Sequence, residues 1–361
     1  MDIVLHSGMH KTGTTSFQSW LRERTTALAA ERIRVLTVPP QVNARDPDSF
    51  DPEWIRSILT RFEKAGAART VISHEDISTL DVEALKRLRA ALGERPVRHV
   101  TTFRHWLGFL PSRWMQNCRR RDSQSFPAFL ERLNRDAGMH VDARFDLVLK
   151  TALEAGFEDR IAISWDNAMA TGGILAPLCD ACGIPSGLVP QPGQQAVRAN
   201  TGDPPETSEM LRLFNGVRAR AEDRAPDAMF DAKLTGDRVD VFFDQRRRVE
   251  RIRQTDPTLI HEVETFLAGR RENVRLAAPD FADHAEALAA AAAPFLHNPL
   301  NGHLFPDPPP RVLAVSTVEV TDLADPLRAR MLRRLRQAAR ADGFLRRAAG
   351  RVRKYLGPGR I

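Results

Sequence analysis

The sequence has few cysteines and no long apolar segment. Three cysteines among 361 residues do not provide the paired framework of a disulfide-rich secreted domain. No run approaches the roughly 20 consecutive apolar residues that a membrane-spanning helix needs. The chain starts on β-type residues, Asp2–Leu5, without the basic region and apolar stretch of a secretory signal. We therefore expect a cytoplasmic protein.

Acidic residues are nearly missing from residues 327–361, which hold twelve basic residues and one acidic residue, Asp342. The whole chain carries a net charge of +7, so this tail at +11 leaves −4 for residues 1–326. Apolar residues among the arginines indicate a basic amphipathic helix. Such a helix can lie on an anionic membrane, hold an acidic glycan or pack on the domain as an arm. These alternatives stay open, including a peripheral position at the inner membrane, and we expect no specific nucleic-acid partner.

Short β-branched runs alternate with stretches of helical spacing over the first 170 residues. This alternation predicts an α/β fold, a three-layer parallel sheet with helices on both faces and a mostly helical C-terminal part. We expect an α/β domain over residues 1–285, an Ala/Pro-rich connector over 286–311 and the basic extension over 312–361. The predicted strands are Ile3–Leu5, Val35–Val38, Thr70–Ser73, Val97–Phe103, Ile161–Ser164 and Val312–Val320, and the predicted helices include Phe17–Ala30, Glu53–Ala65 and Val82–Leu92.

The first strand is followed by a phosphate-binding pattern, GMHKTGTT. Its glycines let backbone N–H groups turn inward, and the helix that follows directs the positive end of its dipole at the same spot. Lys11 adds a full charge and the threonines add hydroxyl donors. The candidate phosphate ligands are Gly8, His10, Lys11, Thr12, Gly13, Thr14 and Thr15.

The Walker lysine is absent from this loop. In GxxxxGK[ST] the lysine follows the second glycine, but here Thr14 occupies that place and the lysine stands inside the loop, at position 11. The chain also shows no apolar strand that ends in an Asp next to the loop. Both absences argue against an ATPase or GTPase. A P-loop kinase with an altered lysine stays open as an alternative, as does a non-catalytic module that binds a nucleotide or an anionic surface.

The segment LHSGMHKTGTTSFQ resembles the 5′-phosphosulfate loop of bacterial sulfotransferases that use 3′-phosphoadenosine-5′-phosphosulfate (PAPS). Members of that family typically read GxxKTGTTxLQ after the first strand. The resemblance implies a P-loop sulfotransferase fold and transfer of a sulfuryl group from PAPS to a hydroxyl or amine. It further implies adenosine 3′,5′-bisphosphate as coproduct, no required metal, and a carbohydrate or glycolipid as acceptor.

The family places a second phosphate site after a later strand, with an Arg at the strand end and a Ser eight residues on. Arg104 and Ser112 have this spacing, although His105-Trp106 replaces the usual Asp-Pro. An Arg presents a planar fork to a phosphate, and a Ser adds a hydroxyl. The resemblance also suggests Arg198 as a ligand of the 3′-phosphate and a closing helix at Phe266–Arg275.

The acceptor needs a base at the same edge of the sheet. His74, Glu75 and Asp76 follow the strand Thr70–Ser73, and ligands of open α/β sheets bind outside the carboxyl ends of the strands. The family often carries Ser-x-Glu here, which favours Glu75 as the general base. His74, whose ordinary pKa lies near neutrality, is the alternative, and Asp76 is expected to cap the next segment. These residues, the loop and Arg104 should converge.

The cysteines do not form a recognisable metal-binding motif. Cys179 and Cys182 form a single CxxC in a helical stretch, without the second pair or the histidines that a zinc site needs. We expect both thiols, like Trp20, Trp106, Phe109 and Trp114, to pack in the core.

Overall fold

The computed structural model describes residues 1–37, 50–120, 122–135, 144–189, 204–221, 239–297 and 303–356, with the backbone alone at 120, 239–245 and 342–356. The chain forms two compact units, each assembled from three segments. The first comprises Met1–Leu110, Leu133–Thr201 and Leu276–Arg311, and the second comprises Pro111–Arg132, Gly202–Arg275 and Val312–Ile361. Helix α5 (Trp106–Arg120) begins in the first and continues in the second.

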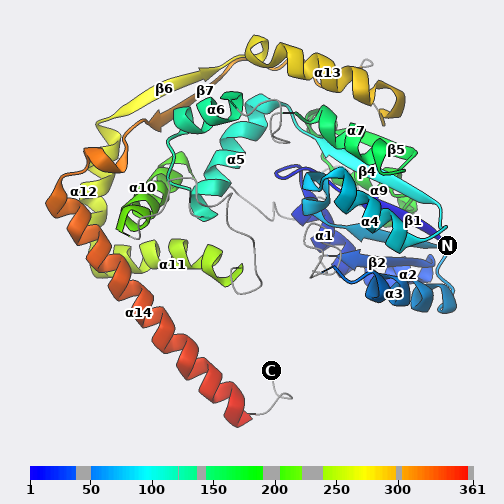
Figure 1. Ribbon diagram of the computed structural model, residues 1–361, viewed down its shortest axis with the longest axis horizontal. Coiled ribbons are helices and arrows are strands. Elements are labelled where there is room, and N and C mark those ends of the chain that lie inside the picture. The colour runs from blue at the N-terminus through cyan, green and yellow to red at the C-terminus, as the bar shows by residue number, and fades with distance from the viewer. Residues whose placement is uncertain are drawn as a thin grey trace. The chain divides into compact units, whose positions relative to one another are not determined.

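The first unit is built on a parallel sheet of five strands (Figure 1). Their order is β2-β3-β1-β4-β5, so β1 lies at the centre with β3 on one side and β4 on the other. The predicted α/β class is confirmed, and each strand predicted for this sheet forms. The strands are β1 (Asp2–His6), β2 (Ile33–Thr37), β3 (Arg69–Ser73), β4 (Val97–Phe103) and β5 (Asp159–Ser164).

Helices cover both faces of this sheet because successive side chains of β1 point to opposite sides. Ile3 and Leu5 pack in one core with α3 (Pro52–Lys64), α4 (Val82–Leu92) and α7 (Asp146–Glu154). Val4 packs in the other with α1 (Thr14–Glu23), α2 (Thr25–Ala30) and α9 (Leu175–Ala181). The predicted helix Phe17–Ala30 is two helices, interrupted at Arg24. Short helices η2 (Glu75–Thr79) and α8 (Trp165–Ala170) follow β3 and β5.

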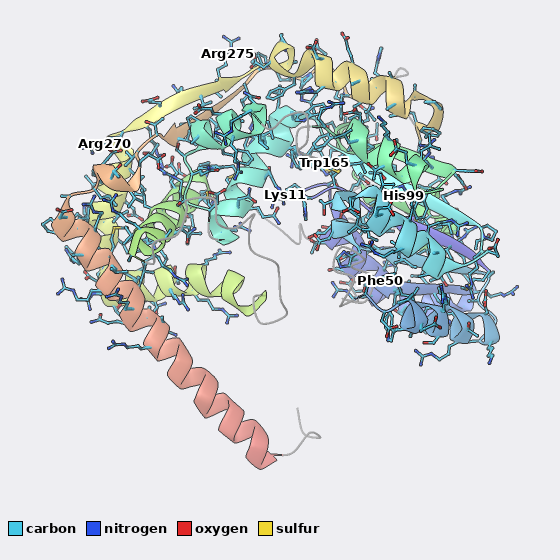
Figure 2. All side chains as sticks on the ribbon, viewed as in Figure 1. Lys11, Phe50, His99, Trp165, Arg270 and Arg275 are labelled. Carbon is cyan, nitrogen blue, oxygen red and sulfur yellow. The ribbon has the colours of Figure 1, made fainter. Side chains whose placement is uncertain are left out.

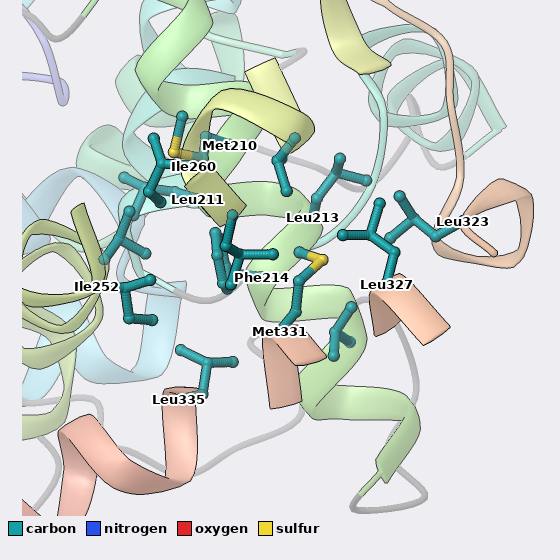
Figure 3. Close-up of a cluster of buried hydrophobic side chains, with 14 of the residues drawn as sticks. Met210, Leu211, Leu213, Phe214, Ile252, Ile260, Leu323, Leu327, Met331 and Leu335 are labelled. Carbon is teal, nitrogen blue, oxygen red and sulfur yellow. The ribbon is translucent and has the colours of Figure 1, made fainter. Parts of the chain in front are cut away.

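The second unit is mostly helical and has a core of its own (Figure 3). Its main helices are α6 (Phe126–Arg135, of which residues up to Arg132 belong here), α10 (Pro205–Ala221), α11 (Val239–Thr255), α12 (Pro257–Ala268) and α14 (Asp325–Leu356). Leu327, Met331 and Leu335 of α14 are buried in this core. The start of the basic helix is thus a packed part of the unit. Among the described residues, no helix combines the length and apolar content that a bilayer crossing requires.

One C-terminal expectation is wrong. The segment proposed as a closing helix leaves α12 after Ala268 and becomes strand β6 (Arg271–Leu276), which pairs with β7 (Arg311–Ser316). A turn at Gly269 and Arg270 ends the helix, and the distant β7 supplies a pairing partner that no local pattern reveals. Helix α13 (Ala282–Ala292) overlaps the alanine-rich start of the segment expected as a connector, whose role as a connector stays a prediction.

Candidate functional site

Three segments with chemically active side chains follow three adjacent strands. The loop from Ser7 to Gly13 follows β1, His74 follows β3 and Arg104 follows β4. His6, the last residue of β1, is in register with Ser73, the last of β3. Parallel strands end at one edge of the sheet, and ligands bind where the strand order changes direction. The predicted common edge is therefore present, and Figure 2 labels Lys11 there.

Backbone hydrogen bonds hold the loop after β1 against β4. The amides of Ser7 and Met9 donate to the carbonyls of Val100 and Thr102 on β4, at 2.9 and 3.3 Å. Lys11 and Gly13 then adopt positive φ angles of 63° and 88°, and Gly13 caps the start of α1. The Thr12 hydroxyl donates to the Met9 carbonyl at 2.5 Å. Because that bond lies inside the loop, Thr12 fixes the loop shape and has its hydroxyl already engaged.

Space beneath the loop is tight at Gly8. A Cβ atom on Gly8 would lie 2.6 Å from Oγ1 of Thr14 and 2.7 Å from Nε2 of His6. Both polar atoms are buried, and neither has a hydrogen-bond partner among the described residues. Thr14 thus faces the base of the loop, whereas the side chain of Thr15 is exposed. Only a glycine fits at position 8 without displacing a neighbour.

A layer of buried histidines supports the loop from the sheet. Nδ1 of His6 lies 2.9 Å from Oγ of Ser73, and Nε2 of His99 lies 2.6 Å from Oγ of Ser7. Burial is the main cause that lowers the pKa of His6 to about 3 and that of His99 to about 4. Both rings are therefore neutral at pH 7. No motif marked these residues, and their polar character in buried strands was the only available signal.

Arg104 connects the loop to two other strand ends. Its Nη1 donates to the Lys11 carbonyl at 3.3 Å, and its guanidinium carbon lies 4.0 Å from the centre of the Trp165 ring. A Cβ atom on Gly108 would lie 2.9 Å from Nε of Arg104, so this glycine leaves room for the side chain. Burial lowers the pKa of Arg104 to about 10. The guanidinium therefore stays positively charged at neutral pH.

Residues after β5 belong to the same edge, and our sequence analysis missed them. Asp166 Oδ2 accepts the backbone N–H of His105 at 2.7 Å, while His105 Nδ1 accepts the N–H of Leu107 at 3.1 Å. Burial, the main cause, raises the pKa of the Asp166 carboxyl. Because β5 ends at Ser164, the strand-end rule that found His74 and Arg104 also applies to Trp165 and Asp166.

His10 and the acidic pair after β3 form one cluster. His10 Nδ1 lies 3.6 Å from Oε1 of Glu75, and His10 Nε2 lies 3.6 Å from Oδ1 of Asp76. His74 instead caps η2, because its Nδ1 accepts the backbone N–H of Asp76 at 3.2 Å. The expectation that Asp76 is the cap is therefore wrong. With Nδ1 accepting, a neutral His74 carries its proton on Nε2, which favours Glu75 over His74 as the base.

Of the other predicted ligands, Ser112 belongs to the second unit and Arg198 lies outside the described residues. Ser112 is on α5, two turns beyond the start of the helix and within the second unit, so its pairing with Arg104 stays a prediction. Cys179 and Cys182 are buried as expected, and burial raises the pKa of Cys179 to about 12. The four aromatic residues expected in the core, Trp20, Trp106, Phe109 and Trp114, are buried.

Comparisons of the chain with protein-family models, with curated proteins and with solved structures found no match.

Proposed function

We propose that this protein is a sulfotransferase that moves a sulfuryl group from PAPS to a hydroxyl or amine, with adenosine 3′,5′-bisphosphate as coproduct. The observation that carries this proposal is the contact between Arg104 and the Lys11 carbonyl. It places a permanent cation from β4 beside the loop of β1 that resembles a 5′-phosphosulfate site. A ligand with two separate phosphate groups requires two such anion sites, whereas a nucleoside triphosphate presents one chain of phosphates.

The loop fits the 5′-phosphosulfate end of this nucleotide. Gly8 has no side chain, so the backbone can approach a ligand closely at this point. Gly13 in its left-handed conformation starts α1, whose first N–H groups have no partner within the helix. These amides, the dipole of α1 and the charge of Lys11 would hold a dianionic phosphate. When bound, PAPS supplies an activated sulfuryl group.

The remaining roles follow from position and charge. Lys11 is half-buried in the loop and would stabilise the charge that develops on the leaving phosphate. Arg104 would bind the 3′-phosphate, with Ser112 and Arg198 as its proposed partners. Glu75 would accept the proton of the attacking hydroxyl or amine, since its carboxylate is partly exposed at the same edge. No metal is needed for these contacts to the nucleotide.

The acceptor and the location are proposed at the level of chemical class. A carbohydrate or glycolipid acceptor follows from the resemblance of the loop. Arg333, Arg336 and Arg340 of α14 are exposed, which suits an anionic surface such as the inner leaflet of the membrane.

Calorimetric titration of the full chain with adenosine 3′,5′-bisphosphate and with ATP tests the proposal. We expect saturable binding of the bisphosphate at one site and no binding of ATP in the absence or presence of Mg²⁺. A preference for ATP would favour the kinase alternative and overturn the proposal, and so would failure to bind either nucleotide. The exposed arginines of α14 provide a second test, because replacing Arg333, Arg336 and Arg340 by glutamine keeps the buried face of the helix. This triple variant should weaken binding to anionic vesicles and leave bisphosphate binding intact if the tail acts only at a surface.

A further inference from the structure

The cluster of His10, Glu75 and Asp76 combines one nitrogen ligand with two carboxylates. One donor atom from each residue can be chosen so that all three lie within 4.8 Å of one another. The histidine comes from the loop after β1 and the two acids from η2 after β3. Since Glu75 lies 65 positions after His10 in the chain, the fold brings these ligands together, rather than a local sequence pattern.

The distance from His10 to each carboxylate, taken separately, is close to the distance between two ligands of one cation. Two ligands at about 2.1 Å from a tetrahedral metal ion lie roughly 3.4 Å apart, as the bond lengths and angles of such sites dictate. The two His10 nitrogens each lie 3.6 Å from a carboxylate oxygen. A single ion uses one of the two ring nitrogens, so one carboxylate must rotate toward the other side of the ring. Both acidic side chains are exposed enough to do so.

The exposure and the charge of these three side chains also favour a cation site. The His10 side chain is 5% exposed, while Glu75 and Asp76 are 30% and 44% exposed, so a fixed nitrogen is matched with two adjustable oxygens open to solvent. Met9 and Thr12, on either side of the pair His10-Lys11, are hydrogen-bonded to β4 and within the loop itself. With a neutral imidazole the three ligands carry two negative charges, which attract a divalent cation.

We propose that His10, Glu75 and Asp76 form a binding site for one divalent transition-metal ion, of the Mn²⁺ or Zn²⁺ class. Imidazole favours Zn²⁺ and related ions over Mg²⁺ or Ca²⁺, and carboxylates suit Mn²⁺ as well. Three protein ligands leave coordination positions for water or for an oxygen of a substrate, as in catalytic metal sites. The site is additional to the metal-free contacts proposed for the nucleotide, and its existence does not depend on which group the protein transfers. A bound ion would make Glu75 a ligand, so Glu75 would act as the general base only while the site is empty.

Mn²⁺ is the probe, because its unpaired electrons report directly on its ligands. The full chain, first freed of metal by a chelator, is titrated with MnCl₂ by calorimetry. The bound ion is then examined by electron spin-echo modulation. We expect one saturable site whose spectrum shows coupling to an imidazole nitrogen. Absence of a saturable site, or a bound ion without nitrogen coupling, would overturn the proposal and leave His10 as an ion-pairing residue.

Matched variants then identify the ligands. His10→Ala, Glu75→Gln and Asp76→Asn should each weaken Mn²⁺ binding at least roughly tenfold, because the loss of even an outer-shell partner of a metal ligand typically costs about 10–100-fold in affinity. The exposed His261→Ala and Glu83→Gln should leave binding unchanged. Unchanged Mn²⁺ binding in His10→Ala would contradict the site even if all variants fold. Binding of adenosine 3′,5′-bisphosphate is measured in parallel, so that failure of the metal site and failure of the proposed transferase can be distinguished.

Discussion

Arg104 donates a hydrogen bond to the backbone carbonyl of Lys11 and so fixes a residue whose φ angle is positive. An amino acid with a side chain seldom adopts this conformation, and neighbouring structure must hold it. The same guanidinium lies over the Trp165 ring at the end of β5. One side chain thus links the ends of β1, β4 and β5, where the proposed nucleotide site lies.

Replacing Arg104 by lysine tests its geometry separately from its charge. Arg104→Lys keeps a cation but loses the planar fork and the stacking on Trp165. We expect the affinity for adenosine 3′,5′-bisphosphate to fall roughly tenfold or more, because a hydrogen bond to a charged group contributes about 1.5–3 kcal/mol. Calorimetry checks this, with Arg98→Lys as control, since Arg98 pairs with Asp159 at the exposed surface of the sheet. Wild-type affinity in Arg104→Lys would remove this residue from the site.

Two substitutions at Lys11 separate its charge from its backbone strain. Lys11→Ala and Lys11→Gly both remove the ammonium group, so both should abolish sulfuryl transfer and weaken bisphosphate binding to a similar degree. Only glycine accepts a φ of 63° without steric cost, so Lys11→Gly should be about 1 kcal/mol more stable than Lys11→Ala. Urea unfolding measures the difference. Normal transfer in either variant would rule out the proposed role of Lys11, and the exposed Lys86→Ala serves as the control.

Gly8 should not tolerate a methyl group. Gly8→Ala places a Cβ atom against Thr14 and His6, and overpacking of this kind costs about 1–3 kcal/mol. Gly187→Ala is the matched control, because no atom lies within 4 Å of a Cβ there. Urea unfolding of both variants should show a loss of stability at position 8 alone. Equal stability of Gly8→Ala and wild type would mean that the loop moves easily away from His6 and Thr14.

The second unit offers a comparison of a buried and an exposed acid on one helix. Glu206 and Glu209 of α10 both pair with Arg271, at 3.0 and 3.4 Å. Glu209 is fully buried and also accepts the backbone N–H of Ser316, whereas Glu206 is 54% exposed. Glu209→Leu should cost about 3–5 kcal/mol, because it leaves Arg271 and a buried N–H without this partner. Glu206→Leu should cost less than about 1 kcal/mol. Similar losses in both variants would contradict this ranking.

The sheet was predictable because its signals are local. Each strand is a short β-branched run between helices, and residues such as Lys11 and His74 follow directly from the ends of these strands. The family resemblance suggested a helix over Phe266–Arg275. Residues from Arg271 onward form a strand instead, because they pair with β7, which lies some 40 residues further along the chain. Pairing over such distances leaves no periodic signal within one segment.

The site was predictable in part, for a similar reason. The strand-end rule located Lys11, Glu75 and Arg104, but it does not specify which side chains meet. The contact of His10 with Asp76 and the stacking of Arg104 on Trp165 depend on the paths of loops across the edge. His6 and His99 are neutral because they are buried. A single polar residue within a strand pattern does not predict that its side chain is buried, so their charge state could not be inferred from the sequence.

The buried pair His6 and His99 should make the protein less stable in acid. Their pKa values of about 3 and about 4 in the folded chain lie below the value near 6.5 that both should have when unfolded. Between pH 6.5 and about 4 the unfolded chain therefore binds more protons. Each ring then lowers the free energy of unfolding by up to about 1.4 kcal/mol per pH unit, and the stability present above pH 6.5 is lost as the pH falls. Urea unfolding at pH 7, 6 and 5 measures the slope.

His99→Gln can retain a hydrogen bond to Ser7 without a titrating group, so it should reduce this slope, whereas the exposed His261→Gln should not. An unchanged slope in His99→Gln would show that His99 is protonated in the folded protein.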